Sequence, residues 1–325
     1  RLAVLTTSNA SPAVPKLFQG DMYRHPEFLA DPWESDRLAA LAPDKPILVL
    51  GTGLTAADVI TALAAQGHTG HIDAVSRSGL LPTNQNPIPD GESMWERFLH
   101  IPPRFVKKHG ALANVSEILE CLRTDIAERA AEGKTWHGAF DDLRDAARVL
   151  WPDLPLDEQQ RFRRHLKSWY ETRRFRIAPQ IQAVLETQQE SGRLTISAAR
   201  VTAARRSADG GISVTCLPRG QGGTWEKTYG AIINCTGPST VPAESENPVI
   251  AQLVSTGAAT PHPTGHGFLV DQACRPMSAS GEPQITLRII GPLTRSSFME
   301  SGSVPAISFQ IYKIMPDILA SLDAF

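Results

Sequence analysis

Apolar and polar positions around residue 50 predict a strand, a glycine turn, a helix and a second strand. The apolar run at residues 47–50 is followed by Gly51 and then by apolar residues at helical spacing, namely Ala56, Ala57, Val59, Ile60 and Leu63. Gly67 is placed to close that helix, and residues 72–75 form a second short strand. This order and these lengths are typical of a βαβ unit.

Residues 92–191 show mostly helical patterning. Asn114 is a candidate N-cap with Glu117 three residues later. The apolar stripe that follows it consists of Val115, Ile118, Leu119, Leu122 and Ile126. Further stripes run through residues 140–150 and through residues 162–169, the latter after Asp157 and Gln160 in capping-box positions. Because such faces pack on a larger body, we interpret the whole region as a helical insertion.

Strand patterns return after residue 191. They predict a β-meander over residues 194–197, 200–206, 211–217 and 224–235, with ADGG and RGQGG as hairpin turns. Outside the meander, strands are predicted at residues 2–5 and 284–290, and a closing helix from about Pro305. The proline-rich residues 10–45 are interpreted as a connecting segment that passes over the surface.

Composition narrows the class of partner and the compartment. The chain of 325 residues has a formal net charge of -2, which gives no reason to expect nucleic acid or an anionic membrane. No apolar run approaches the roughly 20 residues that span a bilayer, and no signal peptide is visible, so we expect a cytoplasmic protein. The four cysteines show no CxxC pair and no zinc spacing, so we expect them to be reduced and structural, with no metal site.

The turn after residue 50 fits the dinucleotide fingerprint Gly51-x-Gly53-x-x-Ala56. Gly51 permits the tight turn, Gly53 lets a pyrophosphate approach the backbone, and the small Ala56 lets helix and strand pack closely. The free N–H groups at the start of the helix then face the phosphates. The apolar strand before the motif and the helix after it favour a nucleotide site over a merely structural turn.

The residues after the second strand indicate which dinucleotide is bound. An NAD site would place Asp or Glu near residue 76, whereas this sequence has Ser76-Arg77-Ser78. A cation at Arg77 suits a 2′-phosphate, so NADPH is favoured over NADH. The alternative is that Arg77 is only a solvated turn residue.

Two further groups of residues are candidates for a binding role. The first is a basic stretch in which Trp169 and Tyr170 are interleaved with cations. This stretch could bind a phosphate or an anionic substrate, although such a run is more commonly a solvated helix face. Its cations are Arg161, Arg163, Arg164, Lys167, Arg173, Arg174 and Arg176. His262 and His266 flank a Pro/Gly turn without a carboxylate partner nearby, so a loop role is favoured over catalysis.

Taken together, the motifs resemble a known family. LGTGLTAAD followed by SRSGLLP, WYETRRFRIAP, NCTGP and IIGPLTR…VPAISFQ resembles the bacterial FAD/NAD(P)-binding protein family, from about residue 2 to about residue 312. That family is built like flavoproteins with two dinucleotide folds, some relatives of which are flavin-dependent hydroxylases such as urate hydroxylase. VLTTSN resembles the family's VLATGN, at which the FAD domain passes to the NADPH domain.

The resemblance implies an α/β fold: a Rossmann-like NAD(P)-binding domain with a helical insertion, and the C-terminal remainder of an FAD-binding Rossmann-like domain with a β-meander. The implied segments are the end of the FAD domain and a linker (1–45), the start of the NAD(P) domain (46–91), the insertion (92–191), the meander and return strand (192–240) and the C-terminal part of the FAD domain (241–325). No GxGxxG precedes residue 47, and Arg1 is no natural start, so we expect a processed chain or part of a longer one.

The resemblance also assigns cofactor-binding positions. They are Gly51, Thr52, Gly53, Leu54, Thr55, Ala56, Ser76 and Arg77 for NADPH, and Thr7, Ser8, Asn9, Gly291, Pro292 and Val304 for FAD. The sequence departs from the family near the flavin, where Ser8 replaces Gly, and where Ala306 and Ser308 stand at positions that usually hold Glu and Arg. These departures put the flavin contacts in question.

The implied function is an FAD-dependent, NADPH-using oxidoreductase in which hydride passes from NADPH to flavin N5; it is a monooxygenase (hydroxylase) if oxygen takes the electrons. Its partner is a small-molecule substrate. The alternative is a non-catalytic NADP-binding module, or a subunit that needs a separate FAD-binding chain. A single-Rossmann dehydrogenase lacks a catalytic constellation here, and a disulfide reductase lacks its cysteine pair.

Overall fold

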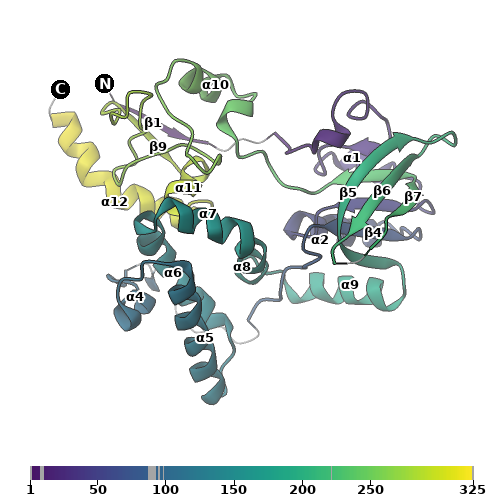
Figure 1. The fold of residues 1–325 in the computed structure, drawn as a ribbon, viewed down its shortest axis with the longest axis horizontal. Coiled ribbons are helices and arrows are strands. Elements are labelled where there is room, and N and C mark those ends of the chain that lie inside the picture. Colours follow the sequence, from purple (N-terminus) through teal and green to yellow (C-terminus); the bar gives the residue numbers. More distant parts are fainter. Residues whose placement is uncertain are drawn as a thin grey trace. The chain divides into compact units, whose positions relative to one another are not determined.

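The computed structural model describes residues 2–7, 11–86, 93, 96–97, 99–220 and 222–323, which form two compact units (Figure 1). Unit 1 consists of Arg1–Ser11, Asn86–Leu166 and Ser239–Phe325. Unit 2 consists of Pro12–Gln85 and Lys167–Pro238. The helical residues 92–191 are therefore divided between the two units, whereas the domain limits expected from the sequence stay a prediction.

Unit 2 combines a large sheet with helices. Its helical elements are η1 (Lys16–Phe18), α1 (Ser35–Ala39), α2 (Leu54–Ala65), α8 (Lys167–Arg174) and α9 (Pro179–Glu190). Its strands are β2 (Phe28–Leu29), β3 (Ile47–Leu50), β4 (Ile72–Ser76), β5 (Leu194–Arg206), β6 (Ile212–Pro218), β7 (Trp225–Tyr229) and β8 (Ala231–Asn234). Within the described residues these strands form one sheet in the order β2-β8-β3-β4-β5-β6-β7.

The sheet of unit 2 is parallel on one side and antiparallel on the other. Strands β2, β8, β3, β4 and β5 pair in parallel, and β5, β6 and β7 form an antiparallel meander. Strand β3, helix α2 and strand β4 form the predicted βαβ unit, with Ile47 opposite Ile72 and Leu50 opposite Val75. The predicted α/β class is confirmed. The meander was expected with the remainder of the FAD-binding domain, whereas it continues the sheet of the βαβ unit.

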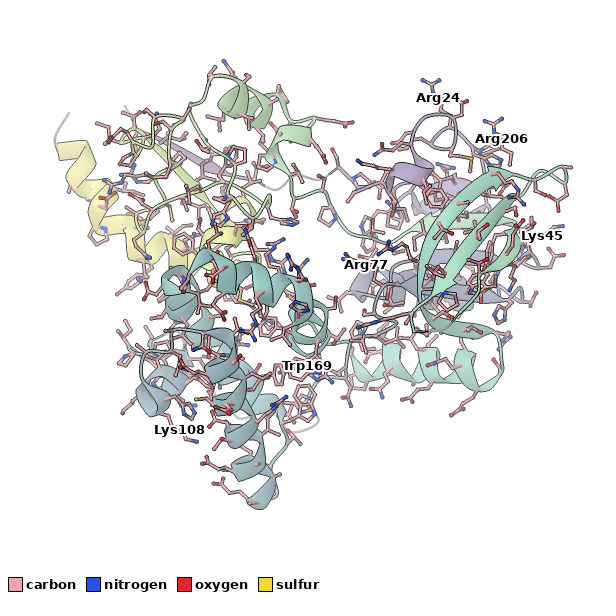
Figure 2. All side chains as sticks on the ribbon, in the orientation of Figure 1. Arg24, Lys45, Arg77, Lys108, Trp169 and Arg206 are labelled. Atoms are coloured by element: carbon pink, nitrogen blue, oxygen red, sulfur yellow. The ribbon has the colours of Figure 1, made fainter. Side chains whose placement is uncertain are left out.

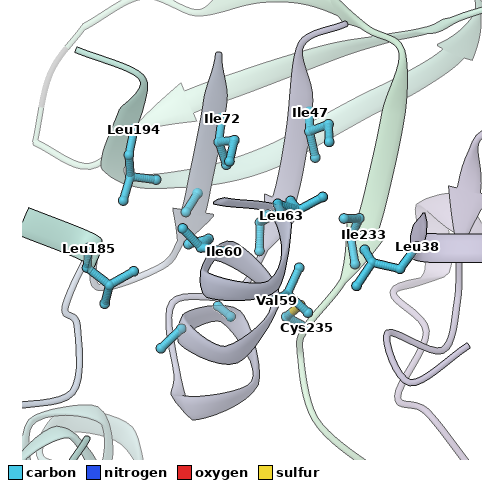
Figure 3. Packing of buried hydrophobic residues seen from close by; sticks show 14 of the residues in the cluster. Leu38, Ile47, Val59, Ile60, Leu63, Ile72, Leu185, Leu194, Ile233 and Cys235 are labelled. Atoms are coloured by element: carbon cyan, nitrogen blue, oxygen red, sulfur yellow. The ribbon is translucent and has the colours of Figure 1, made fainter. Parts of the chain in front are cut away.

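Strand β3 is buried on both faces, as its continuous apolar run indicates for a central parallel strand. Ile47 and Val49 pack with helix α2 in one cluster, and Leu48 and Leu50 pack in a second cluster on the other face. Figure 3 shows the first cluster, in which Val59, Ile60 and Leu63 of α2 lie beneath the sheet. Each such side chain contributes about 1.5–3 kcal/mol when it leaves water, so the βαβ unit sits in a rigid frame.

Two strand predictions in the meander are wrong in extent. Residues 194–206 form the single strand β5, which has an irregularity between Val201 and Ala203 and changes its partner from β4 to β6 along its length. Residues 224–235 form two strands, β7 and β8, because the chain turns at Gly230. A Cβ on Gly230 would lie 2.5 Å from the Cβ of Lys45, so the close approach requires glycine.

The proline-rich residues 12–45 are not a purely superficial connection. Phe18, Phe28 and Leu29 are almost fully buried, and the rings of Phe18 and Phe28 stack with centroids 5.0 Å apart. Strand β2 pairs with β8 at the edge of the sheet. The sequence pattern did not predict these contacts because the strand has two residues and its partner lies about 200 residues away along the chain.

Unit 1 combines helices with a small parallel sheet. Its helices are α4 (Arg104–His109), α5 (Val115–Ala131), α6 (His137–Asp153), α7 (Leu156–His165), α10 (Pro248–Ser255), α11 (Arg295–Phe298) and α12 (Val304–Asp323), with 3-10 turns η2 (Pro242–Glu244) and η3 (Pro292–Thr294). In the described part of unit 1, β1 (Ala3–Thr6) and β9 (Leu287–Ile290) pair in parallel, with Ala3 opposite Leu287 and Thr6 opposite Ile290. The closing helix is confirmed and begins at Val304.

The predicted start of helix α5 is confirmed. The side chain of Asn114 accepts a hydrogen bond from the amide of Glu117 at 2.9 Å. The prediction for the third stripe is wrong, because α7 begins after Pro155 rather than at a cap on Asp157. The stripe also does not continue in one helix, since α7 ends at His165 and α8 begins at Lys167.

We expect Asn114→Ala to lower the free energy of unfolding by about 1 kcal/mol, because the first turn of α5 loses its cap. Urea denaturation followed by circular dichroism measures the change. The matched control is Ser116→Ala, at an exposed position in the same turn, which should change stability by less than about 0.5 kcal/mol. Equal losses in the two variants would contradict the capping role.

In the part of the chain that the structure describes, none of the helices has both the length and the hydrophobicity that crossing a bilayer requires.

Candidate functional site

The turn between β3 and α2 is built around Gly51. Its backbone has φ +110°, and its amide donates a hydrogen bond to the carbonyl of Val75 at 2.8 Å. A Cβ at this position would lie 2.4 Å from the carbonyl oxygen of Cys235, which follows the neighbouring strand β8. Both the conformation and the close approach of two backbones therefore require glycine.

Gly53 leaves open space at the start of helix α2. A Cβ on Gly53 would have no atom within 4 Å. Gly53 is the N-cap, no side chain caps the helix, and its first turn contains no acidic residue. The amides of Leu54, Thr55 and Ala56 precede the first helical bond, which runs from the Ala57 amide to the Gly53 carbonyl. This helix end can therefore receive an anion at its N–H groups.

The other predicted residues of the turn have different surroundings. Ala56 is fully buried against the sheet, as close packing of helix and strand requires, and Leu54 is partly exposed. The buried hydroxyl of Thr52 donates to the carbonyl of Leu80 at 2.7 Å and lies 2.8 Å from the Ser76 hydroxyl. Thr52 thus holds the loop after β4 in place.

The loop after β4 presents Arg77 to solvent. Ser76 accepts a hydrogen bond from the amide of Gly79 at 2.9 Å, so its side chain shapes the loop. Arg77 is exposed and makes no hydrogen bond or ion pair with any described residue. In Figure 2, Arg77 lies on the side of the sheet at which helix α8 is found. Its guanidinium is therefore available to an anion bound at this edge.

A second group of predicted positions gathers in unit 1. Because β1 and β9 are parallel and Thr6 lies opposite Ile290, the residues that follow the two strands emerge at the same edge. Thr7 follows β1, and Gly291 and Pro292 follow β9. Ser8 and Asn9 lie outside the described residues. The structure thus brings together positions that are almost 300 residues apart in the sequence.

Gln310 is a functional candidate that the sequence analysis missed. Its buried side chain accepts a hydrogen bond from the amide of Gly291 at 2.8 Å and donates to the hydroxyl of Thr294 at 3.0 Å. Thr294 in turn donates to the carbonyl of Gly291 at 2.8 Å. The available signal was a single amide on an otherwise apolar face of the closing helix. Helix α12 therefore fixes the turn after β9.

We expect Gln310→Leu to lower the free energy of unfolding by about 1–2 kcal/mol, because the buried Gly291 amide loses its acceptor. Denaturant titration measures the loss. Leu319→Ser, at an exposed position on the same helix, is the control and should be nearly neutral. A Gln310→Leu variant as stable as that control would contradict the role given to this side chain.

Val304 and Ser301 mark the start of helix α12. Val304 is exposed, whereas Ser301 is buried and its hydroxyl has no hydrogen-bond partner in the described part of the chain. Ser303 accepts a long hydrogen bond, 3.4 Å, from the amide of Ala306. Burying a hydroxyl group without a hydrogen-bond partner costs free energy. The start of helix α12 therefore has a hydroxyl group that lacks a partner among the described residues.

The histidines form loop contacts. His262 lies 2.9 Å from the hydroxyl of Thr264, and that hydroxyl lies 2.9 Å from the hydroxyl of Ser296. His266 contacts the hydroxyl of Thr240. Burial, with a smaller contribution from Arg163, lowers the pKa of His262 below its usual value. His262 is thus held neutral within a network of hydroxyls, in keeping with the predicted loop role.

The cysteines are free thiols. Burial raises the pKa of Cys216, Cys235 and Cys274 to about 12 in each case. Thiols with such pKa values stay protonated at neutral pH and are poor nucleophiles. Among the described residues no three His, Cys, Asp or Glu side chains are grouped to hold a metal ion.

The basic stretch is divided between the two units. Arg161, Arg163 and Arg164 belong to α7 of unit 1, and Lys167 and Arg173 belong to α8 of unit 2. The predicted NADPH positions lie in unit 2 and the described FAD positions lie in unit 1. Each group is therefore assembled within its own unit.

No family model and no curated protein matches the sequence. Solved structures do match. L-lysine 6-monooxygenase from Pseudomonas syringae is similar with a TM-score of 0.60 and 18% identity, over 99% of this chain and 64% of that one. The reduced form of ornithine hydroxylase from Pseudomonas aeruginosa gives a TM-score of 0.57 and 16% identity, over 99% and 63%.

A third similar structure is the ornithine N-hydroxylase of Kutzneria sp. 744, described with reduced FAD, NADP⁺ and L-ornithine. Its TM-score is 0.57 at 13% identity, over 98% of this chain and 63% of that one. The chain thus spans less than two thirds of the length of each of these proteins. At such identities the likeness shows the fold, and it confirms the predicted α/β fold class.

Proposed function

We propose that this chain is part of an FAD-dependent, NADPH-using oxidoreductase. The observation that carries the proposal is the uncapped start of helix α2 behind Gly51 and Gly53, together with Arg77 after the next strand, which has no partner among the described residues. The similarity in fold to a hydroxylase described with FAD and NADP⁺ supports it. The proposed NADPH-binding residues are Gly51, Thr52, Gly53, Leu54, Thr55, Ala56, Ser76 and Arg77.

The residues of unit 2 fit a dinucleotide phosphate. The open space at Gly53 leaves room for the phosphate, and the amides at the start of α2 point along the helix axis toward it. Arg77 supplies a positive charge at the end of β4, where the fingerprint places the adenosine ribose. Thr52 and Ser76 position the loop that bears Arg77 rather than contact the cofactor by their hydroxyls.

The residues of unit 1 fit part of an FAD site. We propose Thr7, Ser8, Asn9, Gly291, Pro292 and Val304 as its contacts. The hydroxyl of Ser301, which has no partner in the described part of the chain, and the positive end of α12 are suited to polar and negatively charged atoms of a ligand. Gln310 keeps the Gly291 turn in position. When bound, FAD supplies the capacity to accept hydride from NADPH and to pass electrons to an acceptor.

We further propose that oxygen is the acceptor and that the activity is a monooxygenase acting on a small molecule. Support comes from the fold, which is similar to that of lysine and ornithine hydroxylases. The relation to urate-hydroxylase-like members is a finer proposal that rests on the sequence motifs alone. The segments 1–45, 46–91, 92–191, 192–240 and 241–325 remain the proposed domain limits.

A second candidate is an NADP-binding module that takes its FAD-binding residues from a separate segment or chain. It is favoured by the described sheet of unit 1, in which β1 and β9 pair only with each other, since parallel sheets are normally larger and covered on both faces. Val4 of β1 is half exposed, which agrees with an incomplete sheet.

An absorbance spectrum of the purified protein, followed by NADPH addition without oxygen, tests the proposal. A flavin spectrum that bleaches on NADPH addition supports the oxidoreductase. A colourless protein that binds NADPH supports the second candidate instead. A protein that neither holds flavin nor binds NADPH contradicts both.

A further inference from the structure

The last turn of α8 and the residues that follow it are held against the chain that leaves β4. The amide and hydroxyl of Thr83 donate to the carbonyl of Thr172 at 2.8 and 3.0 Å. The amide of Ile177 donates to the carbonyl of Thr83 at 2.9 Å, and the amide of Gln85 donates to the carbonyl of Ile177 at 3.0 Å. Residues 172–177 therefore flank the chain that leaves β4.

Arg173 lies on this segment and its charge has no carboxylate partner among the described residues. Its guanidinium carbon lies 4.3 Å from the centre of the Trp169 ring. Its Nη1 donates to the carbonyl of Trp169 at 3.2 Å and, more weakly, to the hydroxyl of Thr172 at 3.4 Å. All of these partners are neutral. Partial burial lowers the pKa of Arg173, with no acidic group opposing the effect.

Two other arginines of unit 2 are paired with acids. Arg205 pairs with Glu226, and Arg37 lies 3.5 Å from Glu34. Arg173 is less exposed than Arg205 and yet lacks such a pair among the described residues. Holding a partly buried cation without a counterion costs free energy, which an incoming anion recovers. The surroundings of Arg173 are thus those of a prepared anion site.

We propose that Arg173 binds a phosphate group of the dinucleotide, together with Arg77. The proposal rests on the proposed NADPH site. It gives a binding role to Arg173, which belongs to the part of the basic stretch in unit 2. It gives a positioning role to the hydrogen bonds between Thr83 and residues 172–177. The contact with the Trp169 ring and the hydrogen bond to the Trp169 carbonyl restrain the guanidinium group, and a planar guanidinium can donate two parallel hydrogen bonds to phosphate oxygens.

The phosphate has two possible sources, the 2′-phosphate and the pyrophosphate. They are distinguished by measuring the affinity for both NADPH and NADH by titration calorimetry. If Arg173 binds the 2′-phosphate, Arg173→Gln weakens NADPH binding about tenfold and leaves NADH binding unchanged. If it binds the pyrophosphate, both affinities fall together by a similar factor. Either result supports the proposal.

Arg193→Gln is the matched control. Arg193 also belongs to unit 2 and lacks an acidic partner among the described residues, but it precedes β5 at the edge of the sheet where β4 begins rather than ends. Its substitution should leave both affinities unchanged. Arg173→Lys keeps the charge but loses the planar fork, so it should recover only part of the binding.

The melting temperature of each variant without ligand separates binding from folding. An Arg173→Gln variant that melts like the wild type and binds both nucleotides as tightly overturns the proposal. A wild-type protein that binds neither nucleotide means instead that the proposed NADPH site itself is wrong. Losses shared equally by Arg173→Gln and Arg193→Gln also overturn it, because they reflect overall charge alone.

Discussion

Replacing Gly51 by alanine is expected to lower the free energy of unfolding by about 3 kcal/mol or more. Two costs add. The residue has φ +110°, which an L-alanine rarely adopts, and the new Cβ would lie 2.4 Å from the carbonyl oxygen of Cys235. That oxygen belongs to the backbone beside β3 and cannot move aside without displacing the sheet. Chemical denaturation followed by circular dichroism measures the loss.

Gly53→Ala is the matched control in the same motif. Gly53 has φ -86° and open space around a Cβ, so its stability should change by no more than about 1 kcal/mol. The methyl group would instead occupy the space proposed for the phosphate. The pair separates a glycine needed by the fold from one needed by the ligand. Equal destabilisation by both substitutions would contradict this division.

Arg77→Gln is expected to weaken NADPH binding about 10- to 100-fold while NADH binding stays unchanged. The reason is that the exposed guanidinium has no partner within the described residues and follows β4, where the 2′-phosphate of a dinucleotide is expected. Calorimetric titration with the two nucleotides measures the ratio of their affinities. Because the side chain supports nothing else, the melting temperature without ligand should not change.

Arg77→Lys serves as the graded variant, since it keeps the charge and loses the planar fork. It should fall between the wild type and Arg77→Gln in its preference for NADPH. A preference that is the same in all three proteins would show that the 2′-phosphate is bound elsewhere. A loss of NADH affinity equal to that of NADPH would place Arg77 at the pyrophosphate instead.

The βαβ unit could be predicted from the sequence because its signals are local. The apolar run at 47–50, the glycines and the helical spacing after them lie within about twenty residues. Gly51 and Ala56 are where the fingerprint requires them, one in a left-handed conformation and the other fully buried. Asn114 was predictable for the same reason, because a cap and the amide it accepts from are neighbours in sequence.

Features that depend on distant partners could not be predicted. Strand β5 continues through residues 198–199, where the pattern weakens, because β4 pairs with its first part and β6 with its second. Phe18 and Phe28 are buried in a cluster with residues of strands that come much later in the sequence, such as β6 and β8. Gln310 shows its role only when helix α12 meets the turn at Gly291.

The basic stretch shows how sequence proximity can mislead. Its cations follow one another within sixteen residues, but the structure divides them between two units at Leu166. The bond between Thr83 and Thr172 then joins the second group to the loop after β4, across about 90 residues of sequence. The sequence alone predicts the same solvated helix face for all of these cations. The contacts of Arg173 with Trp169 and Thr172 distinguish it from the others.

Hydrogen exchange with and without NADPH tests the central claim most directly. The claim is that a dinucleotide phosphate binds at the uncapped start of α2. We predict slower exchange at the amides of residues 53–56 when NADPH is present, because these N–H groups have no helical acceptor and would donate to the phosphate. Unchanged exchange at these amides, with NADPH bound to the protein at saturating concentration, would contradict the claim.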